Sequence, residues 1–271
     1  MPVISEICQN HLGDMNCLRQ MVYVSAECGA QAAKIQSFFS DDLGINWDGD
    51  KDRMRALELS WNDQAQFVKW CEEANLIAIT SVYTTRYIQD VWNAGFRYIK
   101  IGSAQARDEL LIKTYMTAGF KVIVSTGGHI LSKIPRFAPL SGVLHCVSKY
   151  PSIPEEADLL RMLEIKKWFF NTPYGFSDHT DPMHAQWDMP LKMAIYMGAT
   201  WIEKHFTIRP RNETRDGPVS ITSVQLTEVC RWDKLSQEQR LLENPSLGIL
   251  ASPKDIHEKD LISRYEGRWK K

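Results

Sequence analysis

The sequence predicts a single-domain α/β protein, a (β/α)8 TIM barrel, and three observations favour this fold. Strand-like runs alternate with amphipathic helical stretches along the whole chain. One local pattern, a helix followed by glycine and then a β-rich run, recurs at 28–36, 94–101, 118–125 and 197–204. Eight such strands in about 250 residues match the size of a closed barrel. The alternative is a doubly wound sheet, which is disfavoured because no strand is followed by a GxGxxG turn.

The repeated glycine indicates how the strands are connected. A glycine just past a helix typically adopts the left-handed conformation that ends the helix. The residues after it have the composition of a strand, as in Phe96 to Ile101. Repeated helix–glycine–strand units imply parallel strands joined by helical crossovers.

The predicted elements follow in order along the chain. Strands are expected to begin near residues 3, 32, 77, 98, 121, 143, 174 and 200. Helices are expected at 15–28, 61–75, 85–94, 107–118, 155–170, 183–198 and 223–243. The barrel is expected to occupy residues 1–243, and residues 244–271 are expected to form a polar C-terminal tail without a second core.

Two connections depart from this repeat. Residues 38–59 form a long polar stretch with five aspartates, Asp41, Asp42, Asp48, Asp50 and Asp52. Such a loop at the catalytic face is typical of a lid or binding loop, and a solvated charge run is the alternative. Residues 127–141 contain two prolines, so the fifth crossover is expected to be one short helical turn or plain loop.

Composition limits the classes of function. The apolar content of 44% and the charged content of 24% are ordinary for a soluble protein with a full core. A net charge of −1 gives no electrostatic reason to expect nucleic acid or an anionic membrane as a partner. No apolar run is long enough to span a bilayer, and the chain opens directly into a strand without a signal peptide. The six cysteines form no CxxC pair, so we expect reduced thiols and a cytoplasmic location.

Two histidines end neighbouring predicted strands. The runs 175–180 and 202–207 are strand-like and contain His179 and His205, with the predicted helix 183–198 between them. The carboxyl ends of parallel strands meet at one face, where barrel enzymes keep their chemistry. Two adjacent imidazoles with open positions left over indicate a catalytic metal site. The alternative is that each histidine hydrogen-bonds within a packed turn.

Other polar residues also stand at predicted strand ends. They include two lysines, an acid and several hydroxyls: Glu6, Lys34, Ser81, Lys100, Ser103, Ser125, Ser148, Tyr150 and Ser177. Lysine and hydroxyl groups at a barrel mouth are typical of a site for a phosphorylated small molecule. Two lysines buried there without a partner would be costly, which favours an anionic ligand.

In order along the chain, eight short runs resemble the sialic acid synthase (N-acetylneuraminate synthase) family of phosphoenolpyruvate-condensing (β/α)8 barrels. The runs are 6–14, 34–36, 100–103, 125–127, 144–146, 150–151, 175–180 and 203–207. The last two are specific, whereas KxxS and STG are weak when taken alone.

The resemblance implies roles for these residues. His179 and His205 would bind a divalent metal, Mn2+ as the first choice and Mg2+ or Co2+ as alternatives, which polarises the aldehyde of an open-chain N-acyl amino sugar such as N-acetylmannosamine. The phosphoenolpyruvate would be held mainly by Lys34, Lys100, Ser103, Ser125 and Ser177, with Ser81 and Ser148 assisting. Its enol carbon would attack the aldehyde, water would add, and phosphate would leave by C–O cleavage.

The same resemblance places Glu6 close to the reacting carbons and Tyr150 near both substrates. Asp216 would bind sugar hydroxyls or the metal-bound water. The predicted catalytic residues are therefore Glu6, Lys100, His179 and His205.

The chain also departs from the family pattern. Gln105 stands where the family usually has glutamate, and glutamine cannot transfer a proton. The family's C-terminal antifreeze-like domain, which gives an arginine to the partner subunit's site, is not expected here. A homodimer and a separate antifreeze-like domain protein are therefore expected partners. Two alternatives are the same chemistry on another aldose, as in octulosonate and heptulosonate synthases, and a non-catalytic or split-enzyme barrel that binds metal and a phosphorylated anion.

Overall fold

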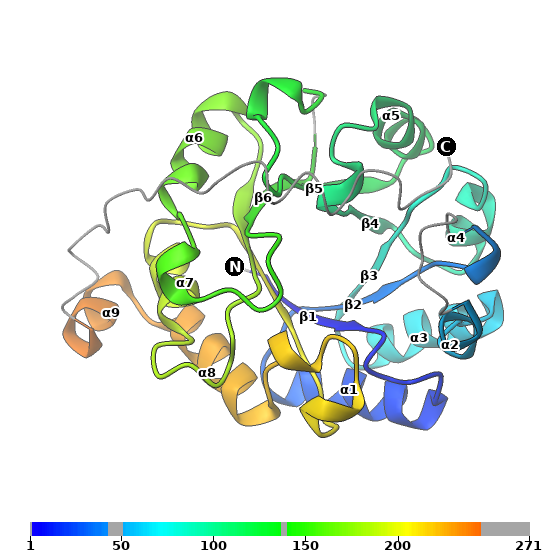
Figure 1. Cartoon of the computed structure of the whole chain (residues 1–271), viewed down its shortest axis with the longest axis horizontal. Helices are drawn as coiled ribbons and strands as arrows, with labels where there is room; N and C mark the ends of the chain where they lie inside the picture. Colours follow the sequence, from blue (N-terminus) through cyan, green and yellow to red (C-terminus); the bar gives the residue numbers. More distant parts are fainter. Residues whose placement is uncertain (1, 43–50, 137–139, 245–271) are drawn as a thin grey trace.

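The computed structural model describes residues 2–42, 51–136 and 140–244 and contains a closed barrel of eight parallel strands (Figure 1). Each strand pairs with the next, and the barrel closes between the first and the last. The strands are β1 (Val3–Cys8), β2 (Ala32–Gln36), β3 (Ile77–Ser81), β4 (Tyr98–Ile101), β5 (Lys121–Ser125), β6 (Gly142–Cys146), β7 (Tyr174–Asp178) and β8 (Trp201–His205). The predicted fold is confirmed, and each strand begins within one residue of its predicted start.

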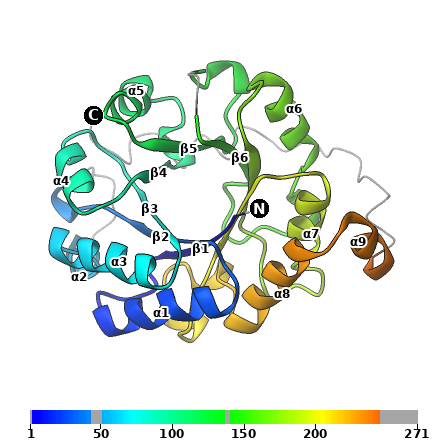
Figure 2. The same ribbon diagram turned by 180° about the vertical axis from the view of Figure 1, so that it is seen from behind.

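Helices surround the barrel on its outside (Figures 1 and 2). They are α1 (Met15–Glu27), α3 (Trp61–Glu73), α4 (Ile88–Asn93), α5 (Glu109–Thr117), α6 (Leu160–Trp168), α7 (Met189–Tyr196) and α8 (Ser223–Lys234). The glycines after α1, α4, α5 and α7 have φ between 84° and 101°, which is the left-handed conformation predicted for them. No helix in the described ranges is long and apolar enough to cross a membrane.

Three predicted helices were wrong in extent. The helix predicted at 155–170 is α6, which begins only at Leu160, after the separate 3-10 turn Pro154–Glu156. The helix predicted at 183–198 is only α7, because Pro190 is tolerated in the first turn of a helix and excludes helical turns before it. The helix predicted at 223–243 is two helices, α8 and α9 (Gln237–Glu243). The break follows from Ser236, whose hydroxyl caps the backbone amide of Gln239 and starts a new helix.

The two irregular connections contain short helices. Residues 51–56 of the long polar stretch form α2 (Lys51–Ala56), and a 3-10 turn covers Ser40–Asp42. Asp48 and Asp50 lie outside the described residues. The fifth crossover contains one 3-10 turn, Leu131–Lys133, which is the short helical turn predicted as one of its two alternatives.

Apolar side chains fill two regions. One lies between the barrel and its helices and contains Leu18, Phe67 and Phe96. The other fills the N-terminal half of the barrel interior with Ile4, Ala32, Ile79, Ile123, Leu144 and Trp201. Side chains alternate across a strand, so the inward residues further along the same strands reach the C-terminal half of the interior. That half is polar.

Trp201 needs space that glycine provides. A Cβ added to Gly175 on the neighbouring strand would lie 2.0 Å from the Trp201 carbonyl oxygen. The indole Nε1 donates a hydrogen bond to the Ser141 carbonyl oxygen at 3.0 Å.

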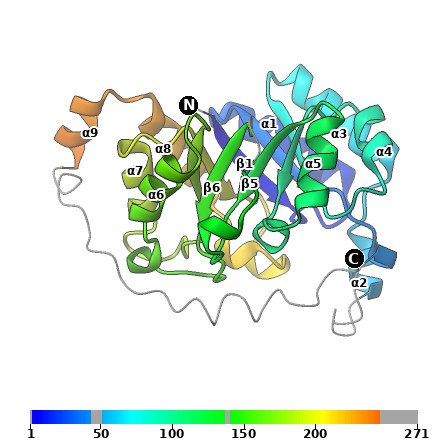
Figure 3. The same cartoon turned by 90° about the horizontal axis from the view of Figure 1, so that it is seen from above.

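Figure 3 shows the barrel from the side, with α2 and the loop between β8 and α8 at the same end of the barrel.

Candidate active site

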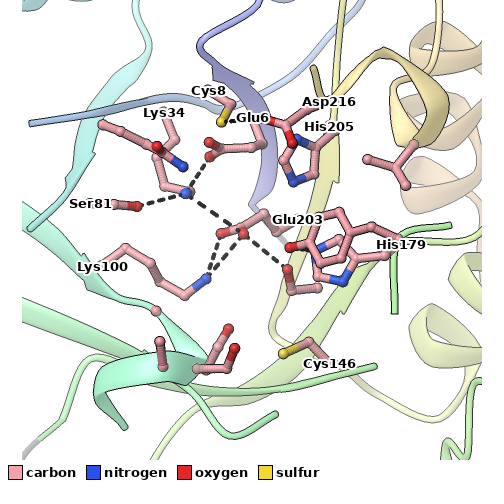
Figure 4. Close-up of a pocket in the computed structure, with 18 of the residues that line it drawn as sticks. Glu6, Cys8, Lys34, Ser81, Lys100, Cys146, His179, Glu203, His205 and Asp216 are labelled. Atoms are coloured by element: carbon pink, nitrogen blue, oxygen red, sulfur yellow. Dashed lines mark hydrogen bonds and ion pairs between the residues drawn. The ribbon is translucent and has the colours of Figure 1, made fainter. Parts of the chain in front are cut away.

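A cavity of about 440 Å3 lies at the C-terminal end of the barrel, which is within the size range of small-molecule sites. All the residues that the sequence nominated line this one cavity (Figure 4). They are Glu6, Lys34, Ser81, Lys100, Ser103, Gln105, Ser125, Ser148, Tyr150, Ser177, His179, His205 and Asp216. Residues from every strand or the loop after it therefore converge.

Glu203 lies at the centre of the polar network. The Lys100 ammonium group donates to both of its carboxylate oxygens at 3.0 and 2.9 Å, and the Ser177 hydroxyl donates at 2.9 Å. Lys34 Nζ lies 3.8 Å from Glu203 Oε1. Burial alone would raise the pKa of Glu203, but Lys100 and Lys34 outweigh it and hold that pKa well below its usual range.

A second ion pair joins β1 to β2. Glu6 stands opposite Lys34 in the sheet, and their side chains form a buried salt bridge. Lys34 also donates to the Ser81 hydroxyl at 3.0 Å. Burial raises the pKa of Glu6 to about 7, even though Lys34 lowers it. A carboxyl group with this pKa can give or take a proton near neutral pH.

The sequence argument for an anionic ligand assumed that the two lysines have no protein partner, but Lys34 pairs with Glu6 and Lys100 pairs with Glu203. Glu203 was not nominated as a site residue. It stands two residues before His205 on one strand and therefore faces the same side, a signal that strand parity could have supplied.

The two histidines lie side by side. Their ring centroids are 5.5 Å apart and their planes are tilted by 55°. The Tyr150 ring stacks on His179 with the centroids 4.0 Å apart. The Tyr150 hydroxyl lies 2.7 Å from His179 Nε2, and His179 Nδ1 donates to the Val147 carbonyl oxygen at 2.6 Å.

Both imidazoles are suited to bind a divalent metal. Burial lowers the pKa of His179 to about 4 and that of His205 well below its ordinary value, so both are neutral at pH 7. His205 is buried, yet its Nδ1 has no hydrogen-bond partner in the described part of the chain. A divalent ion would bind His179 through Nε2 in place of the hydrogen bond with Tyr150, and the neighbouring His205 ring would supply a second nitrogen. These residues therefore fit the predicted metal.

Two of the cavity's hydroxyl groups, those of Ser103 and Ser148, lie close together. Ser148 Oγ donates to Ser103 Oγ at 3.4 Å. Gly127, with φ of 53°, allows them to approach, because a Cβ there would lie 2.6 Å from the Ser103 Cβ. Gln105 is buried nearby, and neither atom of its amide makes a hydrogen bond with another described residue. A buried amide left without partners costs about 1–3 kcal/mol, and a hydrogen-bonding ligand in the cavity would remove this cost.

The mouth of the cavity is formed by loops after the strands. Asp216 precedes the 3-10 turn Gly217–Val219, and its Oδ2 accepts a hydrogen bond from the Cys8 thiol at 2.8 Å. Phe38, Met54, Tyr83 and Arg215 also line the cavity. Sequence reasoning did not nominate these four, because connections between strands lack a periodic signal that fixes the direction of their side chains. It also did not nominate Cys8, whose left-handed backbone at the end of β1 has no signal in the sequence.

Comparisons with known proteins agree with this geometry. The NeuB family profile matches residues 21–240. The chain is 24% identical to the N,N'-diacetyllegionaminic acid synthase of Campylobacter jejuni over 252 residues, covering 84% of this chain and 74% of the relative. It is 23% identical to the N-acetylneuraminate-9-phosphate synthase of Homo sapiens over 280 residues, covering 95% and 75%.

The fold is also that of a solved synthetase. The crystal structure of N-acetylneuraminic acid synthetase from Leptospira borgpetersenii, in complex with citrate, superposes with a TM-score of 0.77 at 22% identity. The match covers 98% of this chain and 92% of that chain. Because the family profile spans most of the chain, the protein belongs to the NeuB family.

Proposed function

We propose that this protein condenses phosphoenolpyruvate with the aldehyde of an open-chain N-acyl amino sugar to give a sialic-type (nonulosonic) acid and phosphate. One observation carries the proposal. Two neutral histidines face two lysines and a set of hydroxyls across a single cavity, in a chain of the NeuB family. The synthase names of the relatives support the same class of reaction.

The metal side of the site belongs to His179 and His205. They would hold a divalent ion, Mn2+ in our proposal, which supplies a Lewis acid for the aldehyde oxygen. Tyr150 stacks on His179 and is 45% exposed, so it can contact both the ligand and the solvent. Asp216 is placed to accept hydrogen bonds from sugar hydroxyls.

The phosphoenolpyruvate side belongs to the lysines and serines. Lys34, Lys100, Ser103, Ser125 and Ser177 bind its phosphate and carboxylate, with help from Ser81 and Ser148. Glu203 holds both ammonium groups in position before the anion arrives. Such preorganised charge stabilises the negative charge that remains on the phosphate as it leaves.

The proton chemistry belongs to Glu6. Attack of the enol carbon on the aldehyde forms the C–C bond and leaves a cationic carbon, to which water adds. Glu6 takes the proton from that water, since its pKa of about 7 permits transfer in either direction. Cleavage of the C–O bond then releases phosphate.

The direct test is phosphate release from phosphoenolpyruvate with Mn2+ and N-acetylmannosamine, its 6-phosphate and 2,4-diacetamido sugars as acceptors. We expect release to require both the metal and one of these aldehydes. His205→Asn should abolish it. His184→Asn, which changes a histidine outside the cavity, should not. Phosphoenolpyruvate left intact with every aldehyde would contradict the proposal.

Gln105 favours a second candidate, the same chemistry on a different aldose. It presents an amide where an acid was expected from the resemblance, and that amide faces the cavity without a described partner. Arabinose 5-phosphate and erythrose 4-phosphate belong in the same panel. Turnover with one of these, and none with the N-acyl sugars, would select this candidate. Phosphoenolpyruvate binding in calorimetry without any turnover would instead indicate a binding barrel or one part of a split enzyme.

Two partners remain part of the proposal. They are a second copy of the chain and a separate antifreeze-like domain protein, both motivated by the resemblance. Light scattering tests the first. Activity that rises when such a domain is added in trans tests the second.

A further inference from the structure

Cys8 occupies an unusual place at the end of β1. The β1–β2 register shifts between Glu6 and Cys8, and Cys8 has a φ of 53°. A non-glycine residue in this left-handed conformation costs about 1–2 kcal/mol. Irregular strand ends of this kind redirect side chains beside functional sites. Here the thiol is buried and lines the cavity.

The thiol lies beside a metal-binding side chain. One ligand-type atom each from Glu6, Cys8 and His205 all lie within 4.8 Å of one another. Two ligands of a single ion, one sulfur and one nitrogen, are at most about 4.4 Å apart, so a small side-chain adjustment brings them into range. His205 is only 5% exposed, and its Nδ1 has no hydrogen-bond partner in the described ranges.

We propose that the Cys8 thiolate is a further protein ligand of the divalent ion, beside His205. The inference rests on the metal site of the proposed function and goes beyond it by giving the ion a sulfur donor. On binding, the S–H bond breaks, the proton leaves to solvent, and the sulfur electron pair forms the bond to the metal without any oxidation.

Asp216 is the positioning residue for this ligand. In the metal-free protein its Oδ2 accepts a hydrogen bond from the Cys8 thiol at 2.8 Å and fixes the direction of the thiol before the metal displaces its proton. Partners that orient a ligand in this way contribute to metal affinity without touching the metal. Glu6, although close, is engaged by Lys34 and stays with the proton chemistry.

A sulfur ligand changes which metals the site prefers. Thiolates favour Co2+, Zn2+ and Cd2+ over Mg2+, whereas imidazole and carboxylate alone discriminate less. The ion polarising the aldehyde would therefore sit in a softer donor set than two histidines provide.

The test is a Co2+ titration of metal-free, substrate-free protein followed by absorption spectroscopy. We expect a thiolate-to-cobalt charge-transfer band in the near ultraviolet for the wild type. Cys8→Ser and Cys8→Gly should both lack the band. Cys146→Ser is the matched control, because Cys146 also lines the cavity but lies at its opposite end from Cys8 (Figure 4). It should keep the band.

Affinity gives a second readout. Loss of a side chain that only orients a metal ligand typically lowers metal affinity by about 10–100-fold. In calorimetry, the affinity of Cys8→Ser for Cd2+ should fall by more than this. Its affinity for Mn2+ should fall much less. Cys8→Gly guards against misfolding, since glycine adopts a φ of 53° without strain. Circular dichroism melting checks that each variant is folded.

The outcomes separate this inference from the proposed function. Co2+ bound to the wild type without the sulfur band, or with the same band in Cys8→Ser, overturns the ligand assignment alone. A sulfur band in the wild type with no phosphate release for any aldehyde supports the ligand and overturns the function. A wild type that binds no Co2+ overturns the ligand assignment and the metal site on which it rests.

Discussion

Glu203 shows how one buried carboxylate organises a site. It accepts hydrogen bonds from Lys100 and Ser177 and attracts Lys34, so three strands depend on it. In the proposed function, an incoming anion would meet two ammonium groups that Glu203 already holds in place. An ion pair buried this deeply adds little net stability. Removing one partner is strongly destabilising, because the other charge then remains buried without a counter-charge.

Glu203→Gln should therefore destabilise the ligand-free protein by about 3–5 kcal/mol in urea unfolding. Phosphate at high concentration should restore part of the loss, because an anion can replace the missing charge. Ser177→Ala, which removes only one hydrogen bond to Glu203, serves as the control and should cost about 1 kcal/mol. Equal stability of Glu203→Gln and the wild type would exclude the structural role.

At this scale the sequence was informative about which residues meet. Polar residues at strand ends must converge once the strands form a barrel, and Lys34, Ser125 and His205 do so. The pairing of charges was not predictable in the same way. Lys100 and Glu203 belong to β4 and β8, and only the closed geometry shows that they touch. The left-handed backbone of Cys8 likewise has no signal in the sequence.

Individual strands carry different chemistry on their two sides. On β6, Cys146 faces the cavity, whereas His145 is buried and its Nε2 donates to the carbonyl oxygen of Ala157 at 2.7 Å. On β8, Glu203 faces the cavity, whereas Lys204 pairs with Asp178 at 2.6 Å outside the network. The limits of β2, β4, β5 and β8 were predictable because a glycine marks the end of the helix before each of them. Helix limits at 183–198 and 223–243 were not, because Pro190 and Ser236 outweigh the periodicity of the apolar residues.

The outer side of β6 should make stability depend on pH. Burial lowers the pKa of His145 to about 4, below the ordinary 6.5. Between these two pH values the unfolded chain binds a proton at His145 and the folded chain does not. The contribution is complete above pH 6.5 and is lost as the pH falls toward 4, by an amount on the order of 3 kcal/mol. Urea unfolding between pH 7 and pH 4 measures it. His145→Gln should lose less stability over this interval than the wild type, and identical slopes would refute the assignment.

The contact between β7 and β8 should not tolerate a side chain at Gly175. In Gly175→Ala the new Cβ would lie 2.0 Å from a backbone carbonyl oxygen, which cannot swing aside. We expect a loss of at least about 3 kcal/mol, at the upper end for overpacking. Gly102→Ala is the matched comparison, since its Cβ would meet only Gln105 Oε1 at 3.6 Å. Chemical denaturation of both variants decides, and similar midpoints would contradict the prediction.

Closure of the barrel is what turns scattered strand ends into one site. Glu6 and His205, far apart in the sequence, are direct neighbours because β1 pairs with β8. The size and number of the repeated units made this topology predictable. The arrangement of the loops that form the mouth was not, since turns without periodicity do not reveal where Tyr83 or Arg215 points.

A metal at the histidine pair should stabilise the whole fold. Binding at 100 times the dissociation constant adds about 2.7 kcal/mol, which for a chain of this size raises the melting temperature by roughly 5–10 °C. Mn2+ should produce this shift in thermal unfolding and a chelator should reverse it. His205→Asn should abolish the shift and His184→Asn should retain it. A shift of the same size in His205→Asn would place the ion elsewhere.

The apolar floor formed by Ile4, Ile79, Leu144, Trp201 and their neighbours has a kinetic consequence. These side chains fill the N-terminal half of the barrel interior, so in the proposed reaction the substrates and products would enter and leave at the C-terminal ends of the strands. With a single entrance, the substrate that binds deeper in the cavity must bind first. The product that lies deeper must likewise be released last. Initial-rate patterns with product inhibitors should therefore be those of a compulsory-order mechanism.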